Sequence, residues 1–225
     1  MATDRTFREE HVLADGTRVT LRAIQPDDAD ELRRAFGRLS ARSRYQRFLG
    51  GVPELTDAMV TYLTQVDGED HVAIVAGTDS LDLKTEIGLG VARFVRLADE
   101  PTVAEAAVTV VDDAQGRGIG RLLLQGLAAQ ALARGVRVFR GEVLAENTRM
   151  CHLLGEVGAA MRVADGQTLV FDVPLQEPPE EVVAKEPTHP LRRLLRAAAE
   201  SLGMGRPAPS QPAPPPPEPD RGDAA

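Results

Sequence analysis

The 225-residue sequence contains no tryptophan, one cysteine and two lysines, and aromatic residues make up only 4% of it. The lone Cys151 cannot form a disulfide within the chain, and the polar N-terminus lacks the apolar core of a secretory signal. We therefore expect a protein of the reducing cytoplasm. No apolar run approaches the roughly 20 residues that a membrane-spanning helix requires, so we expect no membrane span.

Basic residues are fewer than acidic residues. The chain has 26 Lys and Arg against 34 Asp and Glu, which gives a formal net charge of -8 at pH 7. Affinity for nucleic acids comes largely from clustered Lys and Arg, so we expect no nucleic-acid partner. His11, His71 and His189 show no spacing typical of metal ligands, and we expect no metal site.

Proline is concentrated at one end of the chain. Twelve of the sixteen prolines lie at or after Pro178, and residues 207–225 are dominated by Pro, Ala and acidic residues, which predicts a disordered tail. Residues 189–203 place Leu and Ala at helical spacing beside three arginines, which predicts a short amphipathic helix that docks on the domain or binds a partner or membrane surface. We expect a folded domain over residues 1–175, followed over 176–225 by a linker, this helix and the Pro-rich tail.

Strand and helix patterns alternate through the first 175 residues. Runs rich in β-branched residues at 71–76, 87–95 and 103–111 are separated by turn residues, which predicts three successive strands joined as a meander. A helical pattern at 117–133 and a strand pattern at 136–144 follow, so the sheet becomes parallel through this helix. We expect an α/β fold with a mixed, mostly antiparallel central sheet flanked by helices. The other expected elements are strands at 19–24 and 168–173 and helices at 26–39, 56–66 and 147–157.

A glycine-rich turn connects the strand at 103–111 to the following helix. The amides of a first helical turn lack intrahelical partners, and glycines let the backbone approach a ligand, so the turn predicts an anion site, although such turns also merely tighten strand-helix connections. Arg117 and Arg121 can add charge-assisted hydrogen bonds, which suits a pyrophosphate. The spacing matches neither a Walker A loop nor a dinucleotide fingerprint. The turn consists of Gln115, Gly116, Arg117, Gly118, Ile119 and Gly120.

Together with the preceding Val-Thr-Val-Val-Asp strand and with Asn147 at the start of the next helix, this turn resembles the acetyl-CoA signature of the GNAT acetyltransferases. The resemblance spans residues 19–173. It is sharpest at 22–29, 39–48 and 104–110, which resemble the GNAT module of bacterial protein lysine acetyltransferases, often fused to acyl-CoA synthetase-like or cyclic-nucleotide-binding regions.

This resemblance implies the GNAT fold, acetyl-CoA as the acyl donor, and transfer to an amine. The implied acceptor is a lysine side chain of a protein, such as an acyl-CoA synthetase. A small-molecule amine is the nearest alternative, and a non-catalytic acyl-CoA-binding regulatory module is another. The acceptor's identity, a longer acyl group and the oligomeric state stay open at this point.

The resemblance also implies roles for single residues. A lysine ammonium has a pKa near 10.4, so the enzyme must remove a proton, and the implied general base is Glu105, directly or through water. Glu142 on the next strand, or no single essential base, are the alternatives. Backbone groups of the strand near 108–110 would pair with the pantetheine arm and polarise the thioester carbonyl. The implied cofactor-binding residues are Val108, Thr109, Val110, Gln115, Gly116, Arg117, Gly118, Ile119, Gly120, Arg121 and Asn147.

Three further features bear on the mechanism. Many GNAT enzymes place a tyrosine general acid where this chain has Leu154, so we expect the thiolate to leave without an acid. The adjacent Cys151 and His152 point about 100° apart on a helix, so we expect no Cys-His nucleophile and a direct transfer. GNAT folds commonly build the acceptor side between the two N-terminal helices. The residues there that can engage an acidic protein surface, or merely pack, are Arg44, Tyr45, Arg47 and Phe48.

Overall fold

The computed structural model describes residues 7–49, 52–79, 86–156, 158–164 and 166–175. These residues form an eight-stranded sheet with the order β1-β2-β3-β4-β5-β6-β8-β7. The predicted helix at 189–203 and the Pro-rich tail lie outside the described residues. The strands are β1 (Arg8–Val12), β2 (Arg18–Ala23), β3 (His71–Asp79), β4 (Glu86–Arg96), β5 (Val103–Val110), β6 (Val138–Leu144), β7 (Ala160–Val163) and β8 (Thr168–Pro174). The helices are η1 (Pro26–Asp28), α1 (Ala29–Gly37), α2 (Ala41–Phe48), α3 (Asp57–Thr64), η2 (Asp112–Ala114), α4 (Ile119–Ala133) and α5 (Thr148–Glu156).

The sheet is mixed, as predicted. Strands β1 to β5 pair antiparallel with their neighbours along the chain, so the expected meander of β3, β4 and β5 is confirmed. Strands β5 and β6 are parallel and are connected through α4, and β8 and β7 then extend the sheet antiparallel. The pair β5–β6 is therefore the only parallel pair among the described strands.

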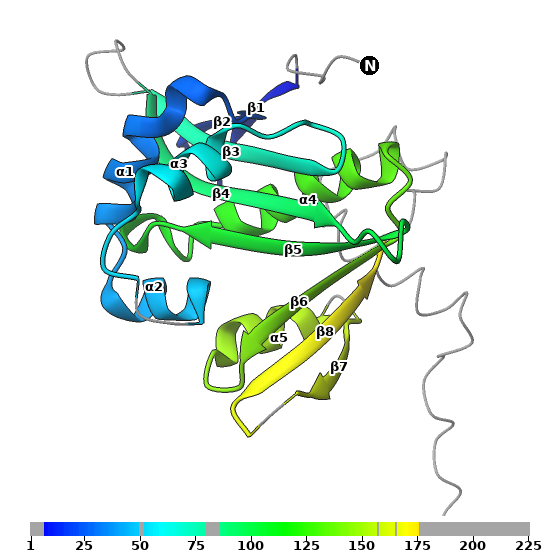
Figure 1. The fold of residues 1–225 in the computed structure, drawn as a ribbon. Coiled ribbons are helices and arrows are strands. Elements are labelled where there is room, and N and C mark those ends of the chain that lie inside the picture. The colour runs from blue at the N-terminus through cyan, green and yellow to red at the C-terminus, as the bar shows by residue number, and fades with distance from the viewer. Residues whose placement is uncertain (1–6, 50–51, 80–85, 157, 165, 176–225) are drawn as a thin grey trace, which may run out of the picture.

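Helices cover both faces of the sheet (Figure 1). On one face α4 packs closely against the sheet at Gly126. A Cβ added to Gly126 would lie only 3.1 Å from the side chains of Leu21 and Ile74. On the other face lie α1, α2 and α3. The alternation of side chains along β3 and β4 supplies both faces, so nearly every residue of these strands is wholly or partly buried. The largest fully buried side chains are Phe94, Leu21, Ile74, Ile119, Leu123, Leu127, Val19 and Val136.

Strands β5 and β6 separate soon after they meet. They pair only from Val103 to Glu105, opposite Val138 to Arg140. Beyond this point β5 continues beside β4 as far as Val110, while β6 continues beside β8 as far as Leu144. Figure 1 shows the V-shaped opening that results. The edge of β5 that faces β6 is therefore without a strand partner over residues 106–110.

The structure adds elements to those predicted, including the short helix η2, and moves several boundaries; β6, for example, begins at Val138 rather than at 136. Strands β1 and β7 and helix α2 were not expected, and residues 41–48 form a helix whose N-cap, the Ser40 hydroxyl, accepts from the Ser43 amide. The helix after the glycine turn begins at Ile119 rather than at 117, because Gly116 and Gly118 have φ values of 82° and 90°, outside the α-helical region. None of the described helices is long and apolar enough to cross a membrane.

Candidate functional site

The glycine turn presents backbone amides at the start of α4. Gly116 and Gly118 both adopt positive φ, which only glycine adopts without strain, and Gly118 is the N-cap of the helix. Among the described residues, the amides from Gly116 to Gly120 donate no hydrogen bond. Their partial positive charge, together with the helix dipole, makes this turn a site for an anion.

Side chains around the turn fix its position. The Gln115 amide nitrogen donates to the carbonyl of Val110 at 3.2 Å and to the Asp112 carboxylate at 3.3 Å. Asp112 also accepts from the Ser40 amide at 3.1 Å, which ties the turn to the start of α2. Burial raises the pKa of Asp112, but hydrogen bonds from Ser40 and Ser43 outweigh it and lower that pKa below its usual value. The turn is thus anchored both to β5 and to the corner between α1 and α2.

The two arginines of the turn are paired with carboxylates. Arg117 Nε donates to Asp15 at 2.8 Å, and Arg117 also donates to the hydroxyl of Thr17. The hydrogen bond from Arg117 holds the pKa of Asp15 well below its usual range. Arg121 donates to Glu156 of α5 at 3.1 Å. The backbone amides are therefore better placed than these side chains to bind a phosphate.

The open edge of β5 contains the three residues expected to meet the pantetheine arm. Val108, Thr109 and Val110 pair with β4 on one side and are each partly buried. Alternation along β5 places the Thr109 side chain on the face covered by α1 to α3, and Val108 and Val110 on the α4 face. The backbone groups of Val108 and Val110 face the opening, where an extended ligand can add as a strand would, whereas those of Thr109 face β4.

Glu105 lies at the fork where β5 leaves β6. It is the last paired position, opposite Arg140, and its side chain is exposed. No hydrogen bond to Glu105 is formed within the described ranges. Glu142, the alternative base, is exposed on β6 two residues beyond Arg140, so the opening separates it from β5. The structure thus places Glu105 on the strand that carries the open edge, and Glu142 on the opposite arm of the V.

Asn147 acts as a helix cap at the far side of the opening. Its side-chain oxygen accepts from the Met150 amide at 3.2 Å, and its backbone carbonyl accepts from Cys151. This is the capping role that asparagine favours, and the side-chain nitrogen remains available to a ligand. The resemblance implied that Asn147 binds the cofactor, and the structure shows that it caps α5.

The neighbouring residues of α5 offer no nucleophile or acid. The Cys151 thiol points to the Leu144 carbonyl at 3.8 Å, while His152 is exposed and lies 3.3 Å from Glu156. Leu154, which stands at the position of the family tyrosine, is 5% exposed and packs in the core. Cysteine and histidine are therefore not arranged as a catalytic pair. In the described part of the chain no three metal-ligating side chains come together.

The four residues expected on the acceptor side all belong to α2. Arg44 lies over the Phe36 ring at 4.5 Å and donates to the Pro53 carbonyl at 2.9 Å, so it has a packing role. Phe48 packs edge-on against Phe36, with ring centroids 6.0 Å apart. Tyr45 is exposed, whereas Arg47 turns toward the sheet, where the negative charge of Glu105 acts to raise its pKa. Only Tyr45 and Arg47 are thus free to meet an acceptor.

Sequence reasoning missed a polar cluster on the same face. Arg93 of β4 is 6% exposed and donates to His71 Nε2 and to the Leu63 carbonyl, both at 3.1 Å. The rings of His71 and Tyr62 lie 4.9 Å apart. The sequence signal for this cluster was that Arg93 stands in the middle of an otherwise apolar strand. Such a strand is buried, so its arginine is expected to have polar partners inside the protein.

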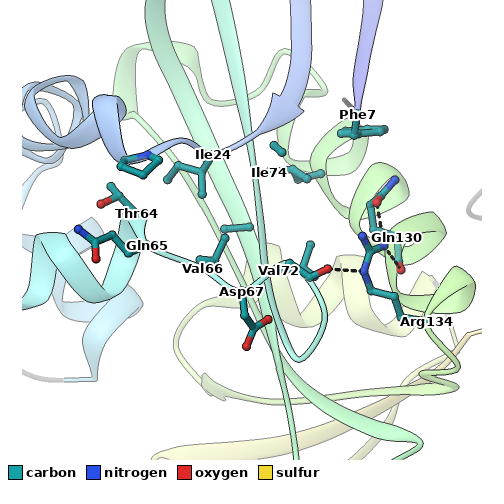
Figure 2. Close-up of a pocket in the computed structure, with 14 residues that line it drawn as sticks. Phe7, Ile24, Thr64, Gln65, Val66, Asp67, Val72, Ile74, Gln130 and Arg134 are labelled. Carbon is teal, nitrogen blue, oxygen red and sulfur yellow. Dashed lines mark hydrogen bonds between the residues drawn. The ribbon is translucent and has the colours of Figure 1, made fainter. Parts of the chain in front are cut away.

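Figure 2 shows a cavity of about 300 Å³ beside the end of β2. It is bounded by the α3–β3 connection and the last turn of α4, where Arg134 donates to the Gly68 carbonyl at 2.7 Å. A 15-residue helix is about 22 Å long. This cavity therefore lies at the opposite end of α4 from the glycine turn and forms no part of the same site.

Comparison with known proteins matches this geometry. Residues 18–160 match a family model described as an acetyltransferase (GNAT) domain. Acetyltransferase Pat of Mycolicibacterium smegmatis is 35% identical over 171 residues, which cover 74% of this chain and 48% of Pat. Acetyltransferase PA5475 of Pseudomonas aeruginosa is 32% identical over 162 residues, 71% of this chain and 84% of that protein.

A solved structure agrees. The GNAT domain of S. lividans PAT superposes with a TM-score of 0.68 and 29% sequence identity, covering 75% of this chain and 97% of that one. The present chain spans about half the length of the M. smegmatis relative. The family match covers strands β2 to β6, the glycine turn, the opening beside β5 and helix α5, and it ends where β7 begins. The chain has the GNAT fold and belongs to the GNAT family of acetyltransferases, which are acyltransferases that use acetyl-CoA.

Proposed function

We propose that this chain transfers an acetyl group from acetyl-CoA directly to a lysine side chain of a protein, with Glu105 as the general base. One observation carries the proposal. Glu105 stands at the fork of the V, on the same strand whose unpaired edge over residues 106–110 can hold the acyl donor. Donor and base are thus positioned by a single strand.

The donor would be held by backbone groups. The amides from Gly116 to Gly120 face an anion and would bind the pyrophosphate, with Gln115 fixing the turn. The edge of β5 at residues 108–110 would pair with the pantetheine arm through the backbone groups of Val108 and Val110, and Asn147 would add a hydrogen bond from across the opening. A β5 amide would polarise the thioester carbonyl and stabilise the negative charge that develops on its oxygen.

The residues present bear on protonation at two groups, the attacking amine and the leaving thiolate. The attacking ammonium has a pKa near 10.4, so it must lose a proton to become a nucleophile, and the exposed carboxylate of Glu105 can accept it directly or through water. The leaving thiolate needs no acid, because a thiol ionises far more readily than an amine. Leu154, which is buried, provides no proton there.

A protein acceptor is supported by likeness and by the exposed surface. The segments 39–48 and 104–110 resemble those of protein lysine acetyltransferases, and the chain is 35% identical to acetyltransferase Pat. On the helices that cover this face, Tyr45 and Tyr62 are 44% and 57% exposed, and exposed tyrosines are typical of protein interfaces. We take an acyl-CoA synthetase in the cytoplasm as the acceptor to be tested first.

A comparison of lysine acetylation in cells with and without this protein tests the proposal, together with an assay of the purified chain. We expect acetyl-lysine sites that depend on the protein, and release of free CoA when lysine peptides are supplied. Turnover with small amines alone would favour a small-molecule acetyltransferase. Binding of acetyl-CoA without CoA release on any amine would favour a non-catalytic acyl-CoA-binding module.

A further inference from the structure

A small cavity of about 80 Å³ lies between the sheet and the helices α1, α2 and α3. Most of its wall is apolar, but Arg47, Arg93 and Thr109 also line it. Arg93 pairs with Ala107 across the β4–β5 ladder, and Glu105 and Thr109 flank Ala107 at alternate positions of β5. Side chains two residues apart on a strand share a face, so Arg93 lies on the same side of the sheet as Glu105, and Arg47 reaches this side from α2.

The acidic side chains that line this cavity are already paired. Asp28 and Glu86 pair with Arg22 at 2.7 Å and 2.8 Å. Glu31 pairs with Arg34 at 2.7 Å and accepts from the Gly88 amide at 2.7 Å. None of these carboxylates lies within ion-pair distance of Arg47 or Arg93 in the described structure.

Arg93 is buried without a negative partner. Its two hydrogen bonds go to neutral acceptors, the Leu63 carbonyl and the ring of His71. Burial and the charge of Arg93 lower the pKa of His71, which keeps that ring neutral and able to accept. Burial, with repulsion from Arg47, lowers the pKa of Arg93 to about 10. A buried charge that lacks a counter-ion is costly, so an anion that entered the cavity would be stabilised.

Arg47 approaches the same space from α2. Its guanidinium lies 5.1 Å from the centre of the Phe48 ring and forms no ion pair within the described ranges. Burial lowers the pKa of Arg47, although the charge of Glu105 acts in the opposite direction. The hydroxyl of Thr109 is buried and has no hydrogen-bond partner, so it is a third donor without an acceptor.

We infer that Arg47 and Arg93, with the Thr109 hydroxyl, form a carboxylate-binding subsite beside Glu105. The carboxylate has two sources, an acidic side chain that flanks the acceptor lysine, or the far end of a dicarboxylic acyl group carried by CoA. In either case the guanidinium groups supply the charge-assisted hydrogen bonds that carboxylates prefer. The inference rests on the proposed function, because it places the subsite beside the proposed base.

Binding measurements on the purified full chain distinguish the two sources. The first arm compares succinyl-CoA with acetyl-CoA by calorimetry. The second arm, in the presence of free CoA, compares a lysine peptide flanked by glutamates with the same peptide flanked by glutamines. We expect one carboxylate-bearing ligand to bind at least about tenfold more tightly than its neutral counterpart, the scale of a charge-assisted hydrogen bond.

Arg47→Gln should abolish that preference, since it removes one guanidinium and leaves the contacts of Arg93 with Leu63 and His71 intact. Arg42→Gln is the matched control, because it removes the same charge from an exposed position of the same helix and should leave the preference unchanged. Unchanged acetyl-CoA affinity in both variants shows that the fold is preserved.

The inference is wrong if neither arm shows a preference in the unmodified chain, or if Arg47→Gln and Arg42→Gln behave alike. Acetyl transfer to the same peptides is measured on the same samples. If the unmodified chain shows the binding preference but transfers no acetyl group, the proposed function is wrong and the subsite is supported. If the unmodified chain transfers the acetyl group but shows no binding preference, the proposed function is supported and the subsite is wrong.

Discussion

Replacing Gly118 by glutamate should weaken acetyl-CoA binding through charge as well as through backbone strain. Gly118 is the N-cap of α4 with φ of 90°, and a Cβ added there meets no atom within 4 Å. The added side chain is therefore not excluded by packing. The left-handed backbone costs a non-glycine residue about 1–2 kcal/mol, which for a domain of this size lowers Tm by about 2–8 °C.

The charge adds a separate effect on the ligand. Two unit charges 4 Å apart repel by about 4 kcal/mol at an effective dielectric constant of about 20, and exposure of the turn to solvent reduces this. Even about a third of that energy is tenfold in Kd. We therefore expect calorimetry to show acetyl-CoA binding at least about tenfold weaker for Gly118→Glu.

Two controls separate the causes. Gly118→Ala carries the strain without the charge, so its Kd should lie closer to that of the unmodified chain. Gly135→Glu carries the same charge and a similar strain, since Gly135 has φ of 79° and open space around its Cβ, but it lies beyond the other end of α4. It should lower Tm without changing the Kd. Equal affinities for Gly118→Glu and Gly135→Glu would refute the claim that the turn holds the pyrophosphate.

Three further predictions concern the tail, the cysteine and pH. A chain truncated after Leu175, which is buried and donates to Arg137, should fold and keep full turnover, and a folded but inactive product would assign the tail a role in chemistry. Cys151→Ala should keep turnover with intersecting two-substrate rate plots, because the thiol faces a carbonyl; parallel plots with acetyl on Cys151 would indicate an acyl-enzyme instead. Burial and Arg93 lower the pKa of His71, so unfolding measurements should show stability falling as pH drops below the unfolded value of about 6.5, and less so in His71→Gln. An identical pH dependence in both proteins would contradict this.

The architecture was predictable because its signals are local. The β-branched runs of β3, β4 and β5 and the glycine turn before α4 depend on residues that are neighbours in sequence. The missed elements lack such a pattern. Strands β1 and β7 are largely exposed edge strands without apolar alternation, and α2 is a polar Arg-rich helix that packs only through part of one face.

The geometry of the candidate site was predictable where it depends on the local backbone and not where it depends on distant partners. The amides around Gly118 follow from local sequence. The pairing of Arg117 with Asp15 joins residues 102 positions apart, and no local pattern indicates it. No local pattern indicates the partners of Arg93 either, because Leu63 and His71 come from α3 and β3. The opening between β5 and β6 depends on where their pairing stops, which the sequence did not predict; the resemblance implied only that backbone groups near 108–110 meet the pantetheine arm.

The most direct test of the central claim is the turnover of Glu105→Gln, with Glu142→Gln as the matched control from the opposite arm of the V. The substitution keeps the size of the side chain and removes its ability to accept a proton. Loss of a positioned general base lowers rates by about a hundredfold to ten-thousandfold. Acetyl-CoA affinity should stay near that of the unmodified chain, because the donor is held by backbone groups.

Acetyl transfer to a lysine peptide should therefore fall by about a hundredfold or more in Glu105→Gln and recover in part at high pH, where more of the amine is already neutral. Glu142→Gln should keep near-normal turnover. Full activity of Glu105→Gln at neutral pH would contradict the account. In that case, an inactive Glu142→Gln with intact acetyl-CoA binding would assign the base to β6, and full activity of both variants would show that no single carboxylate is required.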